Sequence, residues 1–258
     1  MDGTDGPGGR APAAHDDAAA QSRALRAAER RKRQAQPPDA RLYGLARLLG
    51  RLLFGLCVGP EVSGRENVPA AGPLLVVGNH LSFLEPPLVT AVVPRRMTFL
   101  ALTDLFAIGW LGPFLRLLGA LPVRRGGARD LDALRAALEL LRHGGAVAIF
   151  PEGTRSSDSG LLRANPGVAL LALRSGAPVL PVAIVGTERI EAAGPFLTAR
   201  LRRRRVRVVI GRPFRPVAGP GKPDHQAVAD QIMGEVARLL PPAYRGAYAE
   251  RITEASER

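Results

Sequence analysis

The chain lacks several features that would assign it to common classes of protein. Cys57 is the only cysteine, so no disulfide can form within the chain, and a reducing compartment such as the cytoplasm suits it. No run of about 18 uncharged apolar residues occurs, which predicts that no helix spans a membrane. Residues 1–40 are polar and have no apolar core region, so they do not resemble a signal peptide.

Motifs for several kinds of chemistry and recognition are also missing. The sequence has no Gly-x-Ser-x-Gly nucleophile elbow and no phosphate-binding loop of the Gly-x4-Gly-Lys type. It has no helix-turn-helix or RNP-type motif, which makes nucleic acid a weak candidate partner. The histidines are too scattered to signal a metal site; they are His15, His80, His143 and His225.

Positive charge is abundant by contrast. The formal net charge is +13, and lysine occurs only at positions 32 and 222, so arginine supplies nearly all of it. Such an excess suits an anionic membrane surface or anionic substrates. Residues 1–40 are predicted to be a basic, disordered tail, whose arginine-rich part is either solvated or attracted to a membrane.

Residues 41–60 have the pattern of an amphipathic helix. Arg47 and Arg51 are four residues apart and share one face. The opposite face is apolar, and the segment is too interrupted to cross a bilayer, which predicts a helix that lies in the membrane interface. The alternative is a helix that packs on the core of the domain. The apolar face comprises Leu45, Leu49, Leu52, Leu53 and Leu56.

Residues 61–240 alternate short apolar runs with helical patterns, which predicts a single α/β domain. Pro181 lies within the apolar run 179–185 and favours a place at the edge of a sheet or at the end of a strand. Residues 241–258 are predicted to be a polar tail. The expected strands are 62–64, 74–77, 97–102, 121–125, 146–150, 179–185 and 206–210, and the expected helices are 88–93, 108–118, 130–142, 167–174 and 225–240.

His80 and Glu85 lie on a predicted strand-to-helix connection. Gly78 ends the strand, and Pro86 and Pro87 suit the first turn of a helix, where a missing N–H costs little. On a regular helix, residues five apart point about 140° apart, but a turn can bring their side chains together. Glu85 would then orient His80 as a general base. The alternative is a histidine at a strand end and a glutamate at a helix start, where negative charge is favoured.

A second polar connection follows the apolar run 146–150. Phe150-Pro151 leads into Glu152, Gly153, Thr154, Arg155 and Ser156. The guanidinium of Arg155 can bind phosphate through two hydrogen bonds, and Gly153 lets the backbone come close to a ligand. These groups suit an anionic substrate that carries hydroxyl groups.

The motifs together resemble the 1-acylglycerol-3-phosphate acyltransferase family of glycerolipid acyltransferases. That family carries an Asn-His motif, a block ending in arginine, a Phe-Pro-Glu-Gly-Thr-Arg-Ser block and a proline-containing apolar block, in this order. The resemblance extends from Val62 to Phe214. It implies a twisted, mostly parallel or mixed sheet flanked by helices, similar to glycerol-3-phosphate acyltransferase. The matching segments are Asn79-His80, 99–125, 150–156 and 179–182.

The resemblance also implies an activity and a site. The enzyme would move a fatty acyl group from an acyl thioester, acyl-CoA or acyl carrier protein, to a hydroxyl of 1-acylglycerol-3-phosphate or a related lysophospholipid, in phospholipid biosynthesis. It would need no cofactor or metal, and would lie peripherally on the cytoplasmic face of the cell membrane, on an anionic surface. His80 and Glu85 would be the catalytic pair. The acceptor would be bound by Arg125, Glu152, Gly153, Thr154 and Arg155.

Two positions depart from the family pattern. Glu85 stands where the family has aspartate, so it is either a working variant or a sign of lost activity. Leu102 stands where many relatives have lysine, which allows another lysolipid or a glycolipid as the acceptor. The alternatives to an enzyme are a catalytically silent lipid-binding relative and a basic membrane-surface scaffold.

Overall fold

The computed structural model describes residues 40–109, 111–123, 128–156, 158, 160–191 and 206–250. The strands are β1 (Glu61–Ser63), β2 (Leu74–Gly78), β3 (Thr98–Leu102), β4 (Leu121–Val123), β5 (Ala146–Ile149), β6 (Val179–Val185) and β7 (Arg207–Ile210). The α-helices are α2 (Ala40–Cys57), α3 (Glu85–Val92), α4 (Leu111–Leu117), α5 (Ala128–Arg142), α6 (Gly167–Ser175), α7 (Thr187–Glu191) and α8 (His225–Leu239). Short 3-10 turns occur at η1 (Arg65–Asn67), η2 (Thr103–Ala107), η5 (Pro242–Tyr244) and η6 (Gly246–Tyr248).

The seven strands form one mixed sheet in the order β1-β7-β6-β2-β5-β3-β4. The five strands from β6 to β4 run parallel to one another. Strand β7 is antiparallel to β6, and β1 pairs parallel to β7. The mostly parallel or mixed sheet that the sequence predicts is therefore confirmed, and β2 lies between β5 and β6.

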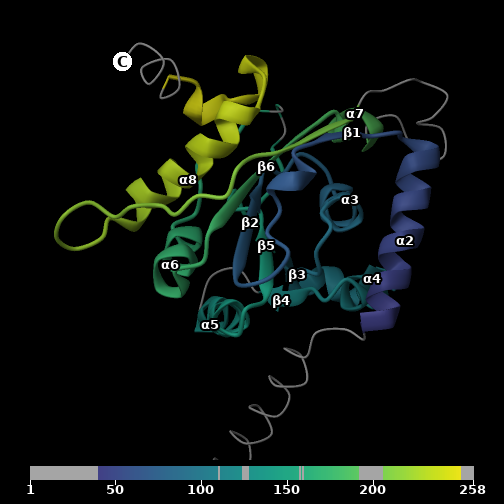
Figure 1. Cartoon of the computed structure of the whole chain (residues 1–258), viewed down its shortest axis with the longest axis horizontal. Helices are drawn as coiled ribbons and strands as arrows, with labels where there is room; N and C mark the ends of the chain where they lie inside the picture. Colours follow the sequence, from purple (N-terminus) through teal and green to yellow (C-terminus); the bar gives the residue numbers. More distant parts are fainter. Residues whose placement is uncertain are drawn as a thin grey trace, which may run out of the picture. The chain divides into compact units, whose positions relative to one another are not determined.

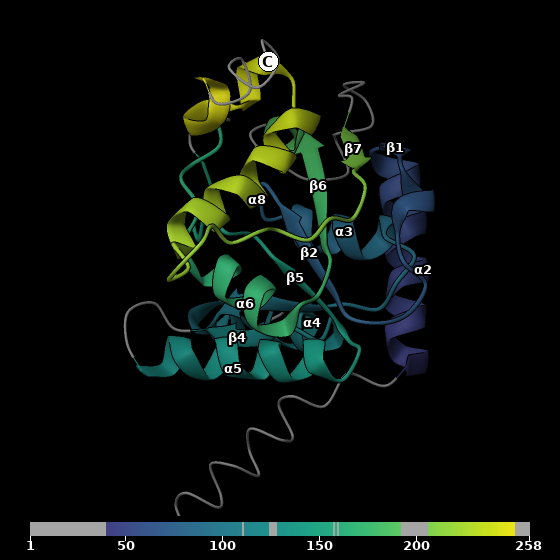
Figure 2. The same cartoon turned by 60° about the vertical axis from the view of Figure 1, so that its left-hand side comes forward.

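Helices cover both faces of this sheet, as Figures 1 and 2 show. Helices α5, α6 and α8 pack on one face, and α2, α3 and α4 lie on the other. Leu75 and Val77 of β2 belong to the first core, whereas Leu74 and Val76 belong to the second. Because both faces are covered, the inner strands are continuous apolar runs rather than alternating patterns.

Helix α2 packs on α3 through one side only. Tyr43 and Phe54 are buried on that side, and the hydroxyl of Tyr43 accepts a hydrogen bond from the backbone N–H of Met97 (3.1 Å). The predicted helix is confirmed, and its leucine face is exposed; the role of this face at a membrane stays a prediction. Among the described residues, no helix is both long enough and apolar enough to cross a membrane. The exposed leucines are Leu42, Leu45, Leu48, Leu49, Leu52, Leu53 and Leu56, each between 49% and 62% accessible.

The position of Pro181 is a correction to the sequence analysis. It lies inside β6, which has neighbours on both sides, and pairs in register with Val77 of β2. The carbonyl of Pro181 accepts a hydrogen bond from the N–H of Gly211 (2.9 Å), so this residue turns its backbone polar groups toward the β7 side. Strand β7 ends at Ile210, so the missing N–H of Pro181 lies opposite Gly211, where the regular β6–β7 pairing ends.

Residues 241–250 also differ from the predicted polar tail. They form the turns η5 and η6, and Tyr244 and Tyr248 are buried. The hydroxyl of Tyr248 accepts from the N–H of Ala164 (2.9 Å) and donates to Asp230 (3.1 Å). This segment therefore completes the core beside α8. The predictions for residues 1–39, 124–127, 192–205 and 251–258 fall outside the described residues.

Candidate active site

Three adjacent strands deliver the polar residues of the candidate site at their carboxyl ends. Strand β2 leads into 79–85, its neighbour β5 leads into 150–156, and its other neighbour β6 leads into Gly186 and Thr187. The carboxyl edge of a parallel sheet, where the strand order changes direction, is where α/β folds place their ligands. Residues more than 100 positions apart in sequence, such as Glu85 and Thr187, converge here for this reason.

His80 and Glu85 meet as their spacing predicts. Nδ1 of His80 lies 2.6 Å from Oε2 of Glu85, and the carboxylate is fully buried while the histidine side chain is 18% exposed. Glu85 is the first residue of α3, followed by Pro86 and Pro87, so the missing N–H groups fall where a helix has no partners for them. Because Glu85 occupies Nδ1, Nε2 is the ring nitrogen that can take a proton from a substrate.

Glu85 is held by donors that compensate its burial. The backbone N–H of Leu81 lies 2.9 Å from both carboxylate oxygens, and the N–H of Ser82 donates to Oε1 (2.9 Å). The hydroxyl of Thr187 also donates to Oε1 (2.7 Å). Donors to a buried carboxylate stabilise its charged form. The longer side chain found where the family has aspartate therefore reaches His80 and is fully hydrogen-bonded.

The imidazole is also fixed through its face and its backbone. The ring of Phe150 stacks on His80, with centroids 4.7 Å apart. The N–H of His80 donates to Oε1 of Glu152 (2.7 Å), and its carbonyl accepts from the N–H of Ser156 (3.0 Å). The connection 150–156 therefore binds both the backbone N–H and the backbone carbonyl of His80.

Asn79 joins the end of β2 to β6. Its side-chain amide donates to the carbonyl of Ile184 (2.8 Å) and accepts from the N–H of the same residue (2.8 Å). The buried side chain thereby takes the place of a strand residue just where β2 stops pairing. It sets the direction in which the chain leaves the sheet before His80.

Glu152 binds Leu162 as well as His80. Its second oxygen accepts from the N–H of Leu162 (2.8 Å), so both oxygens bind backbone groups of the protein. Burial raises the pKa of this carboxyl to about 7; the two N–H donors and the nearby His80 act in the opposite direction, and Glu85 acts with burial. This geometry lets Glu152 join the two polar connections of the site, and its contact with a head group stays a prediction.

Gly153 and Arg155 belong to the same turn. Gly153 has φ +68°, a conformation that favours glycine, and a Cβ there would lie 2.8 Å from the side-chain amide nitrogen of Asn165, which would have to shift. Arg155 is exposed, and its guanidinium carbon lies 3.7 Å from the centre of the Phe83 ring. Phe83 lies between His80 and Glu85 in sequence, so Arg155 is stacked against the connection that holds the pair.

The remaining predicted residues are placed as follows. Thr154 is exposed on the turn beside Gly153, and Arg125 lies outside the described residues. The hydroxyl of Ser156 is buried without a hydrogen-bond partner among the described residues, so a substrate group could supply one. Within the same part of the chain, no group of three or more His, Cys, Asp or Glu side chains could hold a metal ion.

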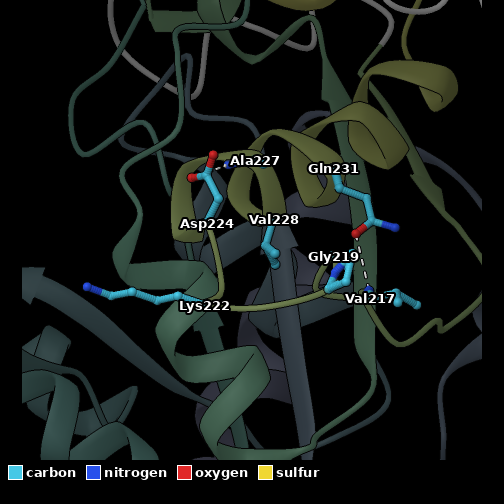
Figure 3. A pocket seen from close by; sticks show the side chains of 8 residues that line it. Val217, Gly219, Lys222, Asp224, Ala227, Val228 and Gln231 are labelled. Atoms are coloured by element: carbon cyan, nitrogen blue, oxygen red, sulfur yellow. Dashed lines mark hydrogen bonds between the residues drawn. The ribbon is translucent and has the colours of Figure 1, made fainter.

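A hollow elsewhere on the domain does not contain these residues. It encloses about 370 Å³ between the loop after β7 and the start of α8. Figure 3 shows the side chain of Gln231 directed at Val217. Its amide oxygen accepts a hydrogen bond from the backbone N–H of Val217 (3.2 Å). Its lining shares no residue with the His80 connections, and comprises Val217, Gly219, Pro220, Lys222, Asp224, Ala227, Val228 and Gln231.

Sequence reasoning missed Thr187, Phe150 as a stacking partner, and the hydrogen bonds of Glu152 to two backbone N–H groups. Threonine after a strand and glycine is common in turns, so Thr187 gives no signal by itself. Its position 102 residues beyond Glu85 becomes meaningful only when β6 is known to lie beside β2.

Comparison with known proteins is consistent with this site. Residues 59–185 match the family model described as Acyltransferase. The 1-acyl-sn-glycerol-3-phosphate acyltransferase of Bacillus subtilis is 27% identical over 165 residues, which cover 64% of this chain and 78% of that protein. The chloroplastic 1-acyl-sn-glycerol-3-phosphate acyltransferase BAT2 of Brassica napus is 33% identical over 156 residues, 60% of this chain. This chain spans 44% of the Brassica protein and 43% of the Arabidopsis thaliana enzyme LPAT1.

A solved structure shares the fold. The crystal structure of the 1-acyl-sn-glycerophosphate acyltransferase PlsC from Thermotoga maritima superposes with a TM-score of 0.58 and 28% sequence identity, and covers 76% of this chain and 79% of that one. The family match, the named relatives and the common architecture together show that the central part of this chain is similar to the acyltransferases in sequence and in fold.

Proposed function

We propose that the protein is an O-acyltransferase that moves a fatty acyl group from an acyl thioester to a hydroxyl of 1-acylglycerol-3-phosphate or a related lysophospholipid, in phospholipid biosynthesis. The observation that carries the proposal is the buried Glu85 bound to Nδ1 of a partly exposed His80. The relatives named above act on 1-acyl-sn-glycerol-3-phosphate by their names, which supports the same class of acceptor.

The chemistry needs one base and no acyl-enzyme. Nε2 of His80 takes the proton of the acceptor hydroxyl as its oxygen attacks the thioester carbonyl. A new ester C–O bond forms, the C–S bond breaks, and the leaving thiolate takes up the proton from His80. Glu85 keeps the imidazole in the tautomer with hydrogen on Nδ1 and stabilises the imidazolium that forms. The segment 179–182 does not offer a free N–H for the oxyanion, because Val179 donates to the carbonyl of Phe214 (2.7 Å), Pro181 has no N–H, and the segment pairs with β2 inside the sheet.

The acceptor phosphate is assigned to the arginines. Arg155 presents a guanidinium stacked on Phe83, beside the His80 connection, and Arg125 is proposed as a second phosphate ligand. Gly153 and Thr154 lie on the same exposed turn and are proposed to contact the head group. Glu152 is proposed to contact the head group as well, with both of its oxygens also bound to backbone N–H groups. The donor is proposed to be acyl-CoA or an acyl carrier protein, and no metal or cofactor enters the reaction.

The membrane partner is proposed to be an anionic surface on the cytoplasmic side, met by α2. Arg47 and Arg51 flank the exposed leucines of this helix, and Arg65 of η1 lies close enough to repel Arg47. Burial lowers the pKa of Arg47, and the charges of Arg51 and Arg65 lower it further. Among the described residues, none of these three arginines forms an ion pair with an acidic side chain. Phosphates of anionic lipids would compensate this charge while the leucines enter the acyl region.

The first experiment measures acyl transfer by the purified protein in vesicles. It supplies long-chain acyl-CoA or acyl carrier protein, and a panel of acceptors that includes lysophosphatidate, other lysophospholipids and glycolipids. We expect transfer by the parent and a loss of at least about 1,000-fold in kcat for His80→Ala, because the general base is gone.

His143→Ala is the matched control. His143 is an exposed residue after α5 whose Nδ1 contacts the carbonyl of Glu139 (2.7 Å), far along the chain from the site. This variant should keep the parental rate. Normal turnover by folded His80→Ala would refute the general-base assignment. Silence of the parent on every acceptor and donor, with vesicle binding retained, would instead favour the lipid-binding relative without activity.

A further inference from the structure

The carboxylate of Glu85 has one hydrogen-bond partner that comes from a different strand of the sheet. That partner is the hydroxyl of Thr187, which lies 2.7 Å from Oε1 and is buried at the start of α7, just after β6. We propose that Thr187 is a positioning residue for acyl transfer, which fixes Glu85 and through it the ring of His80. The inference rests on the proposed function, because the step that it supports is proton removal by His80.

The other donors to Glu85 come from its own connection and not from a neighbouring strand. Leu81 and Ser82 belong to the same short connection as His80 and Glu85, so they move when that connection moves. Glutamate also has one more rotatable bond than the aspartate usual in the family, and so has more freedom to lose. The Thr187 hydroxyl removes that freedom, since it holds Oε1 from the β6 side while Oε2 faces His80.

Thr187 is itself held on both sides. Gly186 before it has φ +94° and donates its N–H to Oε2 of Glu188 (3.0 Å). Oε1 of Glu188 accepts from the hydroxyl of Tyr244 (2.8 Å), so the turn is fastened to the C-terminal segment. Asn79 binds Ile184 a few residues earlier. Two side chains therefore link the ends of β2 and β6 by hydrogen bonds. Asn79, just before His80, binds Ile184, and Thr187, just after β6, binds Glu85.

The competing interpretation is that Thr187 only satisfies a buried hydroxyl and contributes stability. The two interpretations differ in what Thr187→Val changes, because valine keeps the shape and removes the donor. A positioning residue affects kcat and the pH profile, whereas a residue that only stabilises the fold affects the unfolding midpoint. Thr187→Ser restores the donor without the methyl group and so separates the hydroxyl from the packing.

The experiment compares kcat, KM and the pH profile of kcat/KM for the parent, Thr187→Val and Thr187→Ser. We expect Thr187→Val to lower kcat by about 10- to 100-fold, as a small misplacement of a catalytic group does, with KM for the acceptor changed less than about twofold. The acid limb of the profile should move to lower pH, because a carboxylate that is no longer held against Nδ1 stabilises the imidazolium less. Thr187→Ser should behave like the parent.

Thr90→Val is the matched control. Thr90 is a buried threonine of α3 whose hydroxyl donates to the carbonyl of Pro86 (2.9 Å) and does not contact the His80 pair. Removal of this hydroxyl should leave kcat and the pH profile unchanged. Parental kcat and pH profile in folded Thr187→Val, or a rate for Thr187→Ser as low as that of Thr187→Val, would overturn the proposal.

A spectroscopic measurement keeps this test separate from the proposed activity. The ¹⁵N NMR signals of the His80 ring, assigned with His80→Ala, report which ring nitrogen carries hydrogen in the resting protein. We expect hydrogen on Nδ1 in the parent and in Thr187→Ser, and a mixture of tautomers in Thr187→Val. Identical His80 signals in the parent and Thr187→Val would overturn the positioning role, even if no acceptor is turned over. An inactive parent with the expected change in signals would refute only the proposed function.

Discussion

At the scale of single residues, His80 is held at Nδ1, at one face of its ring and at both backbone polar groups. Glu85 takes Nδ1, Phe150 covers a face of the ring, and Glu152 and Ser156 hold the backbone N–H and carbonyl. A base held in this way loses little entropy when the substrate arrives, which is how preorganised sites lower activation barriers. Substitutions of Glu85 and of Glu152 test how much these contacts contribute to activity and to stability.

Glu85→Asp should reduce both activity and stability. The shorter side chain withdraws the carboxylate by about 1.5 Å, so it cannot serve His80, Leu81, Ser82 and Thr187 together. We expect kcat to fall about 100-fold and the free energy of unfolding to fall by about 1 to 3 kcal/mol, as buried donors lose their acceptor. Acyl-transfer assays and urea unfolding measure the two effects. Exposed Glu66→Asp is the control, and a gain of activity in Glu85→Asp would show that the parent is the silent relative.

Glu152→Gln should change how stability depends on pH. The pKa of Glu152 is raised from 4.5 to about 7 by burial, so the folded chain binds more protons than the unfolded chain between these values. Stability from this group is therefore greatest below pH 4.5 and is lost as pH rises to about 7, by about 3 kcal/mol. The difference in unfolding free energy between parent and Glu152→Gln, measured across this window, should show that slope. A difference that stays constant across the window would contradict the shifted pKa of Glu152. Glu139→Gln, at an exposed position, is the control and should show no such slope.

At the scale of elements, α2 presents two opposite faces to two different environments. Tyr43 and Phe54 face α3, and the exposed leucines face away from the domain. The quadruple variant Leu45→Gln, Leu49→Gln, Leu52→Gln and Leu56→Gln should keep the fold and lose affinity for anionic vesicles. At about 1 kcal/mol for each half-buried leucine, we expect vesicle partitioning to fall roughly 100- to 1,000-fold in a sedimentation assay.

A control variant distinguishes this face from general surface hydrophobicity. Val217 is 73% exposed on the loop before α8, so Val217→Gln changes an exposed apolar residue outside α2. It should leave partitioning unchanged. Vesicle binding by the quadruple variant equal to that of the parent would show that α2 is not the membrane contact.

The predictable elements are those whose apolar residues form continuous runs. Strands β2, β5 and β6 follow from such runs because both faces of the sheet are covered, and the turn with Pro86 and Pro87 places His80 near Glu85. Pro181 could not be placed, because its tolerance depends on β7 ending at Ile210. Thr187 and Glu152 could not be assigned either, since their partners come from segments whose proximity only the strand order reveals.

At the scale of the whole molecule, the C-terminal segment stabilises the site from a distance. Leu161 donates its N–H to the carbonyl of Tyr244 (3.1 Å), and the next residue, Leu162, donates to Glu152. Tyr248→Phe removes the acceptor of the Ala164 N–H and the donor to Asp230, both in the buried interior. The free energy of unfolding should fall by about 1 to 3 kcal/mol.

Hydrogen exchange can show where this destabilisation acts. Amide exchange at Leu161 and Leu162 should accelerate in Tyr248→Phe. Tyr43→Phe is the matched control: it removes the acceptor of the Met97 N–H, and so costs a similar bond, but it acts at α2 and should leave exchange at Leu161 and Leu162 as in the parent. Unchanged exchange at Leu161 and Leu162 in Tyr248→Phe would show that residues 241–250 do not stabilise this part of the chain.

The pairing of β1 with β7 has a consequence for synthesis of the chain. Glu61 pairs with Arg207, so 146 residues must be added before the first strand finds its neighbour. At about 5 to 20 residues per second, a ribosome needs on the order of 10 s for this distance. Once α2 and β1 have left the exit tunnel, the nascent chain carries them without the β7 partner of β1 for the rest of that interval. The leucine face of α2 is therefore available to a lipid surface or a chaperone before the domain that it belongs to can close.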